Sequence, residues 1–333
     1  MRKAAVVLAA LVVILAAVAV GVYSYCRGVP GEGKTVRFEV RKGMGAREIV
    51  DALADSGLVR CGWYVVWRYS RLDEPKSLQA GSYMLSDTMP AESILAVMAR
   101  GEVIPVPTHW VTVPEGFTVD QTFDALASAL PVSKSSLDSL ATDSAFLAEL
   151  GVGQLEGYLY PETYEFADSL APAQILSRMV ATARSRFSRM LEGRPDDLSE
   201  REVLILASIV EREAKLESER PVIAGVFLRR LRLGMNLESC ATVQYALGNA
   251  KEKILLSDLQ VESVFNTYLH PGLPPAPICS PGSSSFAAAV SPDTSNGYLY
   301  FVSRVDGSGG HLFARSHPQH LRNVALVRSG NSD

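Results

Sequence analysis

The pattern of hydrophobic and polar positions changes along the chain, and each change predicts a different kind of segment. The first pattern is an unbroken apolar run without charge from Ala4 to Val22. Such a run can cross a hydrocarbon core of about 30 Å as a helix. Two basic residues precede it and two tyrosines follow it, which suits a cytoplasmic N-terminus and a membrane interface. We therefore predict a single-pass transmembrane helix over residues 4–25, with residues 1–3 in the cytoplasm and the remainder outside.

Two alternative roles for this apolar run fit the sequence less well. A cleaved signal peptide has a shorter apolar core and a cleavage site made of small residues, whereas Tyr-Ser-Tyr-Cys follows the run here. A lipoprotein signal would have small or aliphatic residues immediately before Cys26. An uncleaved anchor is therefore the preferred interpretation. The residues at 26–34 include Gly-Val-Pro-Gly-Glu-Gly and form a linker that leaves the membrane.

Beyond the linker, alternation typical of a strand is followed by spacing typical of a helix, and this order occurs twice. The segment Phe38-Glu-Val-Arg-Lys-Gly43 parallels Val111-Thr-Val-Pro-Glu-Gly116, and Asp-Ala-Leu follows each glycine at the same distance. We therefore predict two strand–glycine–helix units of about twenty residues each. Between them the pattern predicts a helix at residues 63–72, a strand at residues 81–85 and a second helix at residues 91–98.

An apolar helix in the second half of the chain ends in two carboxylates. No charge occurs at 203–210, and Glu211 and Glu213 follow. A carboxylic acid against an apolar face keeps its proton to higher pH and can act as a general acid near neutrality. At 100° per residue, Glu211 shares a face with small residues such as Ser208, whereas Glu213 lies nearly opposite. A small-residue face leaves room for a substrate and favours Glu211, although burial alone would favour Glu213 equally. The alternative is a buried helix that simply emerges into solvent.

The segments around this helix complete a mixed α+β pattern. The helix begins with Ser199 as its cap and Glu202 three residues later, the order of a capping box. Five prolines between residues 271 and 282 predict a stiff loop suited to the wall of a cleft. The remaining pattern predicts three helical segments and one strand, at residues 131–150, 173–192, 221–234 and 298–302.

Length and charge restrict the classes of function. A chain of 333 residues is long enough for two or three domains. Its net charge of -4 and scattered basic residues provide no track for a phosphate backbone, so we expect no nucleic-acid partner. The four cysteines are too widely spaced for a zinc ribbon or a disulfide scaffold. In an oxidising compartment, Cys240–Cys279 is the candidate bridge.

Several short motifs occur in one order, and on them the chain resembles the MltG/YceG-like family of endolytic murein transglycosylases. The similarity covers essentially everything after the linker. In chain order the matching segments are Glu156-Gly-Tyr-Leu-Tyr-Pro-Glu-Thr-Tyr164, Leu206 to Arg220, Ala241-Thr-Val-Gln-Tyr245, Asn266-Thr-Tyr268, Gly272-Leu-Pro-Pro275, Tyr298-Leu-Tyr-Phe-Val302 and Gly309-Gly-His-Leu-Phe313.

The resemblance implies an enzyme of the bacterial envelope that cleaves the β-1,4 bond between N-acetylmuramic acid and N-acetylglucosamine within glycan strands. The family's catalytic glutamate is the first of the pair in Ser-Ile-Val-Glu-x-Glu, which is Glu211 here. Ordinary glycosidases use two carboxylates. A lytic transglycosylase can use one, because the muramic C6 hydroxyl attacks C1 within the same molecule. One departure from the family is the pair Cys240 and Ala241, where many relatives carry an acidic residue and a proline.

Further residues are expected to bind the glycan or to support the acid. Glu213 is expected to be structural and to pair with an arginine such as Arg212 or Arg220. Tyr164 and the nearby tyrosines fit core aromatics as well as sugar platforms. A zinc site built on three C-terminal histidines lacks the helix motif that would support it, so we predict no metal and no cofactor. The candidate substrate-binding residues are Ser208, Tyr164, Thr242, Gln244, Tyr245, Asn266, Tyr268 and His311.

Together these expectations define an α+β protein with peptidoglycan as its substrate and peptidoglycan synthases as its expected protein partners. Two other functions stay open: a muramidase that uses water, and a non-catalytic glycan-binding scaffold. The first strand–glycine–helix unit resembles a LysM domain, although a generic α+β scaffold fits nearly as well. The predicted divisions are a cytoplasmic N-terminus (1–3), a transmembrane helix (4–25), a linker (26–34), a LysM-like subdomain (35–105), a connecting region (106–195) and a catalytic domain (196–333).

Overall fold

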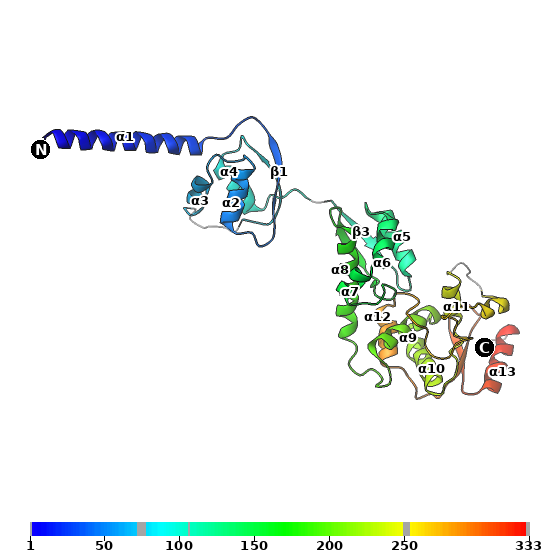
Figure 1. Ribbon diagram of the computed structural model, residues 1–333. Coiled ribbons are helices and arrows are strands. Elements are labelled where there is room, and N and C mark those ends of the chain that lie inside the picture. Colours follow the sequence, from blue (N-terminus) through cyan, green and yellow to red (C-terminus); the bar gives the residue numbers. More distant parts are fainter. Residues whose placement is uncertain (1, 72–77, 106, 249–253, 331–333) are drawn as a thin grey trace. The chain divides into compact units, whose positions relative to one another are not determined.

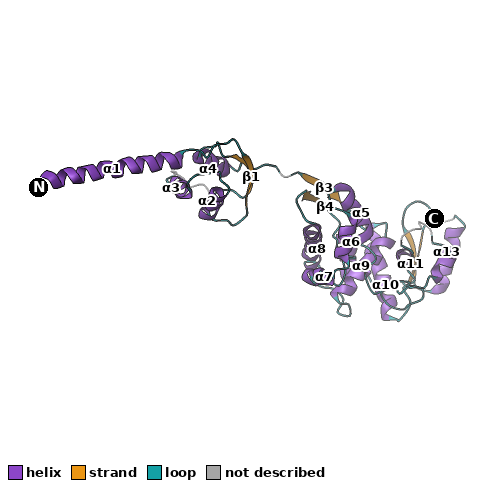
Figure 2. Cartoon of the chain, turned by 45° about the horizontal axis from the view of Figure 1, so that its top comes forward, coloured by secondary structure: helices purple, strands orange, loops and turns teal. Residues whose placement is uncertain are grey.

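A computed structural model describes residues 2–71, 78–105, 107–248 and 254–330 (Figure 1). The chain divides into two compact units, Met1–Val106 and Pro107–Asp333, which we call the first and the second unit. Helices predominate in both (Figure 2). The strands of the described residues form three antiparallel two-stranded sheets, β1–β2, β3–β4 and β5–β6. The mixed α+β class expected from the sequence is therefore confirmed.

The first unit begins with the apolar helix and continues in a small α+β body. Its elements are α1 (Arg2–Arg27), β1 (Thr35–Val40), α2 (Ala46–Asp55), α3 (Gly62–Tyr69), β2 (Gly81–Ser86) and α4 (Ala91–Arg100). Strand β1 pairs with β2, and the inward side chains of both strands pack against α2, α3 and α4. The most deeply buried members of this core include Leu53, Tyr83, Leu85 and Ile94. Alternation placed the strands correctly because one face of the sheet is buried and the other is exposed.

Helix α1 is long and apolar enough to cross a membrane. Its side chains from Val7 to Val22 are exposed, so no described part of the protein supplies the apolar surroundings that they need. The helix also continues through Cys26 to Arg27, two residues beyond the predicted span and into the predicted linker. By length and composition alone, a signal sequence would pass the same test.

The expected Cys240–Cys279 bridge is wrong. The disulfide joins Cys26 to Cys61 in the first unit, across a sequence separation of 35 residues. Cys279 is a buried thiol that donates to the Ser208 carbonyl oxygen, and Cys240 contacts the Tyr268 hydroxyl. Each of the two free cysteines thus has its own local partner. Spacing along the chain carries no information about which thiols the fold brings together.

The second unit contains two hydrophobic clusters. Strands β3 and β4 and helices α5 to α8 surround one, and helices α9 to α12 build most of the other. One short 3-10 helix, η1, precedes α10, and a second, η2, follows α11. The elements are β3 (Thr108–Thr112), α5 (Val119–Ala129), α6 (Lys134–Ala141), α7 (Ser144–Leu150), β4 (Thr163–Ala167), α8 (Pro172–Ser188), α9 (Glu200–Glu213), η1 (Glu217–Glu219), α10 (Arg220–Arg232), α11 (Cys240–Ala246), η2 (Leu256–Gln260), α12 (Ser283–Val290), β5 (Tyr300–Ser303), β6 (His311–Ala314) and α13 (His317–Arg328).

Both predicted strand–glycine–helix units are present, one in each compact unit. Gly43 follows β1 and Gly116 follows β3, and both adopt a positive φ, 95° and 78°. Glycine enters that region without the steric penalty that a side chain would bring. The repeated glycine therefore marks the same turn between a strand and a helix. Each of the two strands pairs with a later strand of its own unit.

Helix α9 is buried along its middle on every side. All eight residues from Val203 to Val210 are buried, and α10, α11 and α12 pack around the helix. Its N-terminus is fixed by the predicted capping box, because the Ser199 hydroxyl accepts from the Glu202 amide while the Glu202 carboxylate accepts from the Ser199 amide. The helix ends at Glu213, and Ala214 is extended. A fully apolar helix of this kind is expected only where packed elements surround it.

Helix α10 passes so close to a loop that only a glycine fits at one position. A Cβ added to Gly225 would lie 1.9 Å from the backbone oxygen of Asp293. We predict that Gly225→Ala destabilises the protein by about 1–3 kcal/mol, because the backbone must shift, despite a gain of about 1 kcal/mol in helix propensity. Gly153→Ala, where a Cβ would meet open space, is the matched control. Equal denaturant midpoints for the two variants would contradict this packing.

Candidate active site

The carboxylate of Glu211 lies at the last turn of α9, and its side chain is only 6% exposed. Its Oε2 atom accepts two hydrogen bonds, from Arg220 Nη1 at 3.0 Å and from the backbone amide of Gly282 at 3.0 Å. The sequence predicted an acid against an apolar face. The apolar run surrounds the helix, but the carboxylate itself faces a guanidinium and a backbone donor. Among the described residues, no hydrogen bond is made to Oε1, which leaves that oxygen for a substrate.

Arg220 is held in place by the start of α10 and by α12. It follows η1 as the first residue of α10, with Pro221 next to it in the first turn. Its Nη1 also donates to the hydroxyl of Ser285 in α12. The side chain is 12% exposed, so this ion pair is largely desolvated and depends on good geometry. Within the described chain its Nε atom is buried without a hydrogen-bond partner, so the site contains an unused donor.

A second carboxylate, Glu115, faces the same point from the turn that follows β3. A Cβ at Gly282 would lie 1.8 Å from Glu115 Oε1, so the glycine is what allows this approach. The next residue, Gly116, lies against Glu211, since its own Cβ would be 3.6 Å from Glu211 Cγ. The turn is tied to the proline-rich loop, because the Gly116 amide donates to the Ser280 carbonyl at 2.9 Å.

The surroundings of Glu115 shift its titration. Desolvation, followed by the nearby charge of Glu211, raises the pKa of the Glu115 carboxyl above its ordinary value. Sequence reasoning included Glu115 only as part of the repeat and did not assign it to the site. The available signal was the Pro-Glu-Gly turn after a strand. This turn can be assigned to the site only because the fold places it at the end of α9.

Glu156 is a third carboxyl with an unusual environment in the second unit. Burial raises its pKa to about 7, although hydrogen bonds from Tyr245 and from backbone amides oppose that shift. Its Oε1 accepts from the Val119 amide at 3.2 Å and its Oε2 from the Tyr245 hydroxyl at 3.2 Å. The residue therefore links the start of α5 to α11. It begins the segment at 156–164 that contributes to the family resemblance, but sequence reasoning assigned no role to its side chain.

Glu213 has a structural role, as expected, but with different partners. Its Oε1 accepts from the Ser239 hydroxyl and from the Ala241 amide, at the N-terminus of α11. The expected pairing with Arg220 is wrong, because that arginine pairs with Glu211 instead. Arg212 donates to the Gly116 carbonyl oxygen at 3.3 Å. The two glutamates therefore point to different neighbours, as the helix phase predicted.

Four of the predicted substrate-binding residues are buried and hydrogen-bonded inside the protein. Ser208 accepts from the Ile278 amide and so holds the proline-rich loop to α9. The Thr242 hydroxyl bonds to the Ser239 carbonyl. The other two are Tyr164, whose hydroxyl donates to the Tyr160 carbonyl, and Asn266, whose side-chain amide donates to the carbonyls of Leu259 and Val261. In this structure these four side chains are engaged in hydrogen bonds within the protein.

The other four predicted residues differ in exposure. Gln244, Tyr245 and Tyr268 are half-buried on or beside α11. His311 is buried, and its Nδ1 lies 2.6 Å from Glu219 Oε2 while its Nε2 lies 3.1 Å from the Ser303 hydroxyl. Since Glu219 immediately precedes Arg220, the histidine steadies the turn that presents the arginine. Among the residues that the structure describes, no group of three or more metal-ligating side chains is present.

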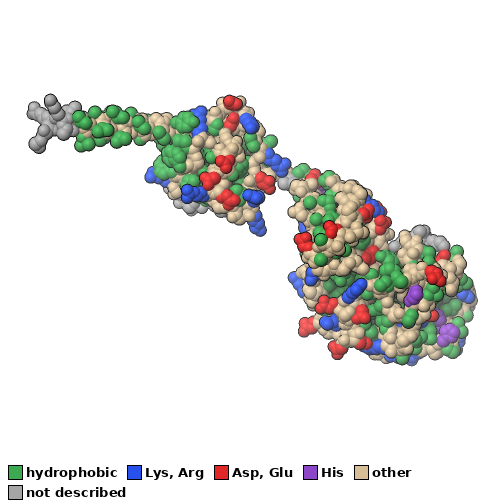
Figure 3. All heavy atoms as spheres, in the orientation of Figure 1, with side chains coloured by type: hydrophobic (Ala, Val, Ile, Leu, Met, Phe, Trp, Pro, Cys, Tyr) green, Lys and Arg blue, Asp and Glu red, His purple; other side chains and the backbone are tan. Residues whose placement is uncertain are grey.

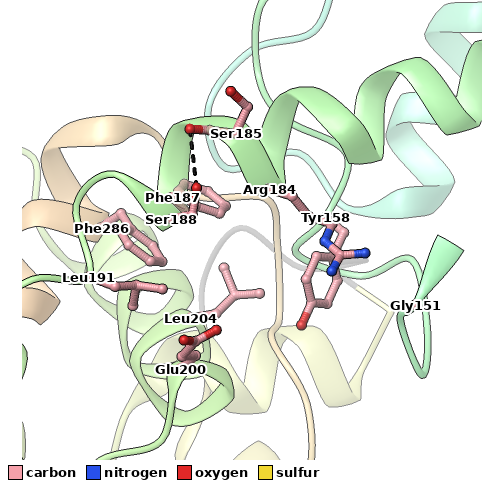
Figure 4. A pocket seen from close by; sticks show the side chains of 10 residues that line it. All are labelled: Gly151, Tyr158, Arg184, Ser185, Phe187, Ser188, Leu191, Glu200, Leu204 and Phe286. Carbon is pink, nitrogen blue, oxygen red and sulfur yellow. Dashed lines mark hydrogen bonds between the residues drawn. The ribbon is translucent and has the colours of Figure 1, made fainter.

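A separate pocket of about 460 Å³ lies among α8, α9 and α12. Figure 4 shows Tyr158 and Arg184 on one side and Leu191 and Phe286 on the other. Arg184 is already engaged, since its Nη1 donates to the Leu150 carbonyl at 2.7 Å. Neither Glu211 nor Arg220 lines this pocket, so the carboxylate site is distinct from it.

Comparisons with known proteins agree with this architecture. The model of the YceG-like family matches residues 38–326. Endolytic murein transglycosylase of Bacillus subtilis (strain 168) is 30% identical over 291 residues, which cover 82% of this chain and 80% of that protein. The protein of the same description from Streptococcus pneumoniae serotype 2 is 29% identical over 323 residues, 88% of this chain but only 58% of the relative.

A solved structure is also similar. The crystal structure of a YceG-like protein from Listeria monocytogenes has 30% sequence identity and a TM-score of 0.58, and the match covers 87% of this chain and 99% of that one. Fold and site define an α+β protein with a buried carboxylate at the end of a core helix. The chain belongs to the YceG-like family, whose relatives are described as endolytic murein transglycosylases.

The raised pKa of Glu156 makes stability depend on pH. The folded carboxyl holds its proton up to about pH 7, whereas the unfolded one releases it near its ordinary value of 4.5. The stabilisation of the folded state by this proton is fully present below pH 4.5 and is lost as the pH rises through 7. The free energy of unfolding falls over this range by up to about 3 kcal/mol. We therefore expect Glu156→Gln to flatten the fall in melting temperature between pH 5 and 8. Parallel pH profiles for the variant and the parent would contradict this.

Proposed function

We propose that this chain is a membrane-anchored endolytic lytic transglycosylase. It cleaves the β-1,4 bond between N-acetylmuramic acid and N-acetylglucosamine within peptidoglycan strands and leaves 1,6-anhydromuramic ends, which terminates strand elongation. The observation that carries this proposal is the placement of Glu211. Its carboxylate is almost fully buried and is oriented through one oxygen by Arg220 and Gly282. Family membership supports the same chemistry at the level of the relatives' descriptions.

Glu211 acts as the acid and then as the base. A proton on its free oxygen passes to the bridging oxygen as the bond from C1 of the muramic sugar to that oxygen breaks. The resulting carboxylate then takes the proton of the C6 hydroxyl, whose oxygen bonds to C1 and closes the 1,6-anhydro ring. The contacts at Oε2 hold the carboxyl in one orientation throughout, which lowers the entropic cost of reaction. The intramolecular nucleophile makes a water molecule unnecessary.

Residues around Glu211 bind and position the sugars. Of the predicted set, Gln244, Tyr245 and Tyr268 are only half-buried and are the strongest candidates for direct contact. Arg220 is proposed to support them by holding the Glu211 carboxyl through its Oε2 atom. The remaining predicted residues are buried, and we propose that they support the site indirectly by holding the surrounding loops in place. They are Ser208, Tyr164, Thr242, Asn266 and His311.

A muramidase that uses water is the second candidate function, and one observation favours it. Glu115 provides a second carboxyl beside Glu211, and two-carboxylate sites are the ordinary arrangement for hydrolysis of glycosidic bonds. In that mechanism Glu115 would activate the water. In the preferred mechanism it tunes the charge of the site and binds no water for attack. The two differ in the product, because hydrolysis leaves a reducing end.

The first unit anchors the enzyme and contacts the glycan. We assign α1 as an uncleaved single-pass anchor, with the rest of the chain on the extracytoplasmic side, on the basis of its exposed apolar surface. The order strand–helix–helix–strand from β1 to β2 supports a LysM-like glycan-binding body. Peptidoglycan synthases are the protein partners that such a termination activity requires nearby. A purely binding scaffold would need no oriented, buried acid.

Glu211→Gln is the direct test of the acid. We expect loss of strand cleavage by the full chain in detergent by at least about 10²-fold, because the amide cannot donate and recover a proton. Glu192→Gln, which changes an exposed glutamate on the same unit, is the control and should keep full activity. Mass spectrometry of the muropeptides measures both. Undiminished cleavage by Glu211→Gln would exclude the assignment.

Glu115→Gln separates the two mechanisms. For a transglycosylase we expect about a 10-fold change or less in rate, because Glu115 acts only through charge, together with unchanged 1,6-anhydromuramic products. Its removal should also shift the pH profile of activity, since a neighbouring ionisable group is lost. Reducing ends in the wild-type digest, together with loss of activity in Glu115→Gln, would establish the muramidase instead.

A further inference from the structure

The disulfide of the first unit fastens the end of the apolar helix to α3. Cys26 lies in the last turn of α1, is only 5% exposed, and bonds to Cys61 immediately before α3. Aromatic packing extends the contact, since the ring of Tyr23 lies edge-on to those of Tyr64 at 5.7 Å and Trp67 at 6.3 Å between centroids. Helix α1 therefore leads directly into the folded body, and Cys26 in its last turn belongs to the core of that body.

This junction places two tryptophans beside the apolar surface of α1. A hollow of about 380 Å³ is lined by Trp63 and Trp67 from α3 and by Ala19, Val20 and Tyr23 from α1. Trp63 is 56% exposed even though it is large and largely apolar. In Figure 3 hydrophobic side chains continue from α1 onto the adjoining end of the first unit. The exposed apolar surface of the helix and that of α3 are thus continuous.

The depth of the tryptophans follows from the helix that they touch. Ala19 and Val20 lie within the apolar run, roughly 3–5 Å below its end at a rise of 1.5 Å per residue. If α1 spans a bilayer, Trp63 and Trp67 must lie at the level where the hydrocarbon meets the headgroups. Tryptophan is enriched at this level because its ring is apolar and its N–H is polar.

Basic side chains surround the same face. Arg60 lies over the ring of Tyr25, with 5.0 Å from its guanidinium carbon to the centroid, and Arg71 lies over Trp67 at 4.5 Å. Arg27 ends α1 and is exposed. Guanidinium groups at this level can bind anionic lipid headgroups while their stems and the aromatic rings remain in the apolar layer. The face therefore has the composition of an interfacial surface.

We infer that α3 is a membrane-surface helix: Trp63 and Trp67 insert into the headgroup region of the bilayer that α1 spans, and the Cys26–Cys61 disulfide holds them there. This rests on the proposed anchor. It adds that the first unit is seated on the lipid surface and does not hang from a free linker. The glycan-binding body of the first unit is therefore fixed at the membrane surface.

Fluorescence quenching by brominated lipids tests this directly, because the chain has only three tryptophans. The full chain is reconstituted in vesicles of phosphatidylcholine and phosphatidylglycerol that contain brominated phosphatidylcholine. One variant keeps only Trp63 (Trp67→Phe, Trp110→Phe). Its matched control keeps only Trp110 (Trp63→Phe, Trp67→Phe), which is 66% exposed in the second unit. We expect the Trp63 emission to fall by roughly half, as for an interfacial ring, and the Trp110 emission to change little.

Each outcome decides one part of the inference. Equal quenching of Trp63 and Trp110 in protein that floats with the vesicles would overturn the seating of α3 and leave the anchor intact. Failure to float would overturn the anchor and the seating together, while muropeptide cleavage in detergent still reports separately on the catalytic proposal. The double change Cys26→Ser, Cys61→Ser in the Trp63-only variant should weaken quenching toward the Trp110 value. Unchanged quenching would show that the disulfide does not hold the helix.

Discussion

The structure of the second unit depends on one constraint, which is that α9 is buried on every side and yet must end in charged residues. A carboxylate at the C-terminus of a helix is repelled by the negative end of that helix's dipole. The two glutamates meet this constraint in the same way, at the N-termini of neighbouring helices. Glu211 accepts from the Gly282 amide at the start of α12, and Glu213 accepts from the Ala241 amide at the start of α11. The end of α9 therefore fixes two other helices, and they in turn orient the acid.

Local features of the sequence predicted most of the elements. The capping box at Ser199, the apolar run of α9 and the repeated strand–glycine–helix order are each determined by residues close together in the chain. The opposite directions of Glu211 and Glu213 also followed from helix phase alone. What failed was pairing across long separations. Neither the Cys26–Cys61 bridge nor the contact of Glu115 with the Glu211 site could be read from spacing, because many folds are compatible with one pattern.

The motif residues illustrate a second limit of sequence reasoning. Polar residues such as Thr242 and Asn266 suggested contacts with sugar hydroxyls, but the structure uses their hydrogen bonds within the protein. Ser208 likewise holds the proline-rich loop at Ile278. A buried polar group costs free energy unless it is paired, so each of these side chains specifies one arrangement of the loops around it. Resemblance at such positions therefore reflects shared hydrogen bonds that arrange the loops within the protein.

The site holds several acids beside two arginines, Arg212 and Arg220. Arg220 pairs with Glu211, while burial raises the pKa of both Glu115 and Glu156. The buried thiol of Cys279 obeys the same rule, because desolvation, then Glu211 and Glu156, raise its pKa well above the ordinary value. It therefore stays neutral and donates to the Ser208 carbonyl. Burial therefore acts in the same direction at Glu115, Glu156 and Cys279, because at each of them it disfavours the charged form.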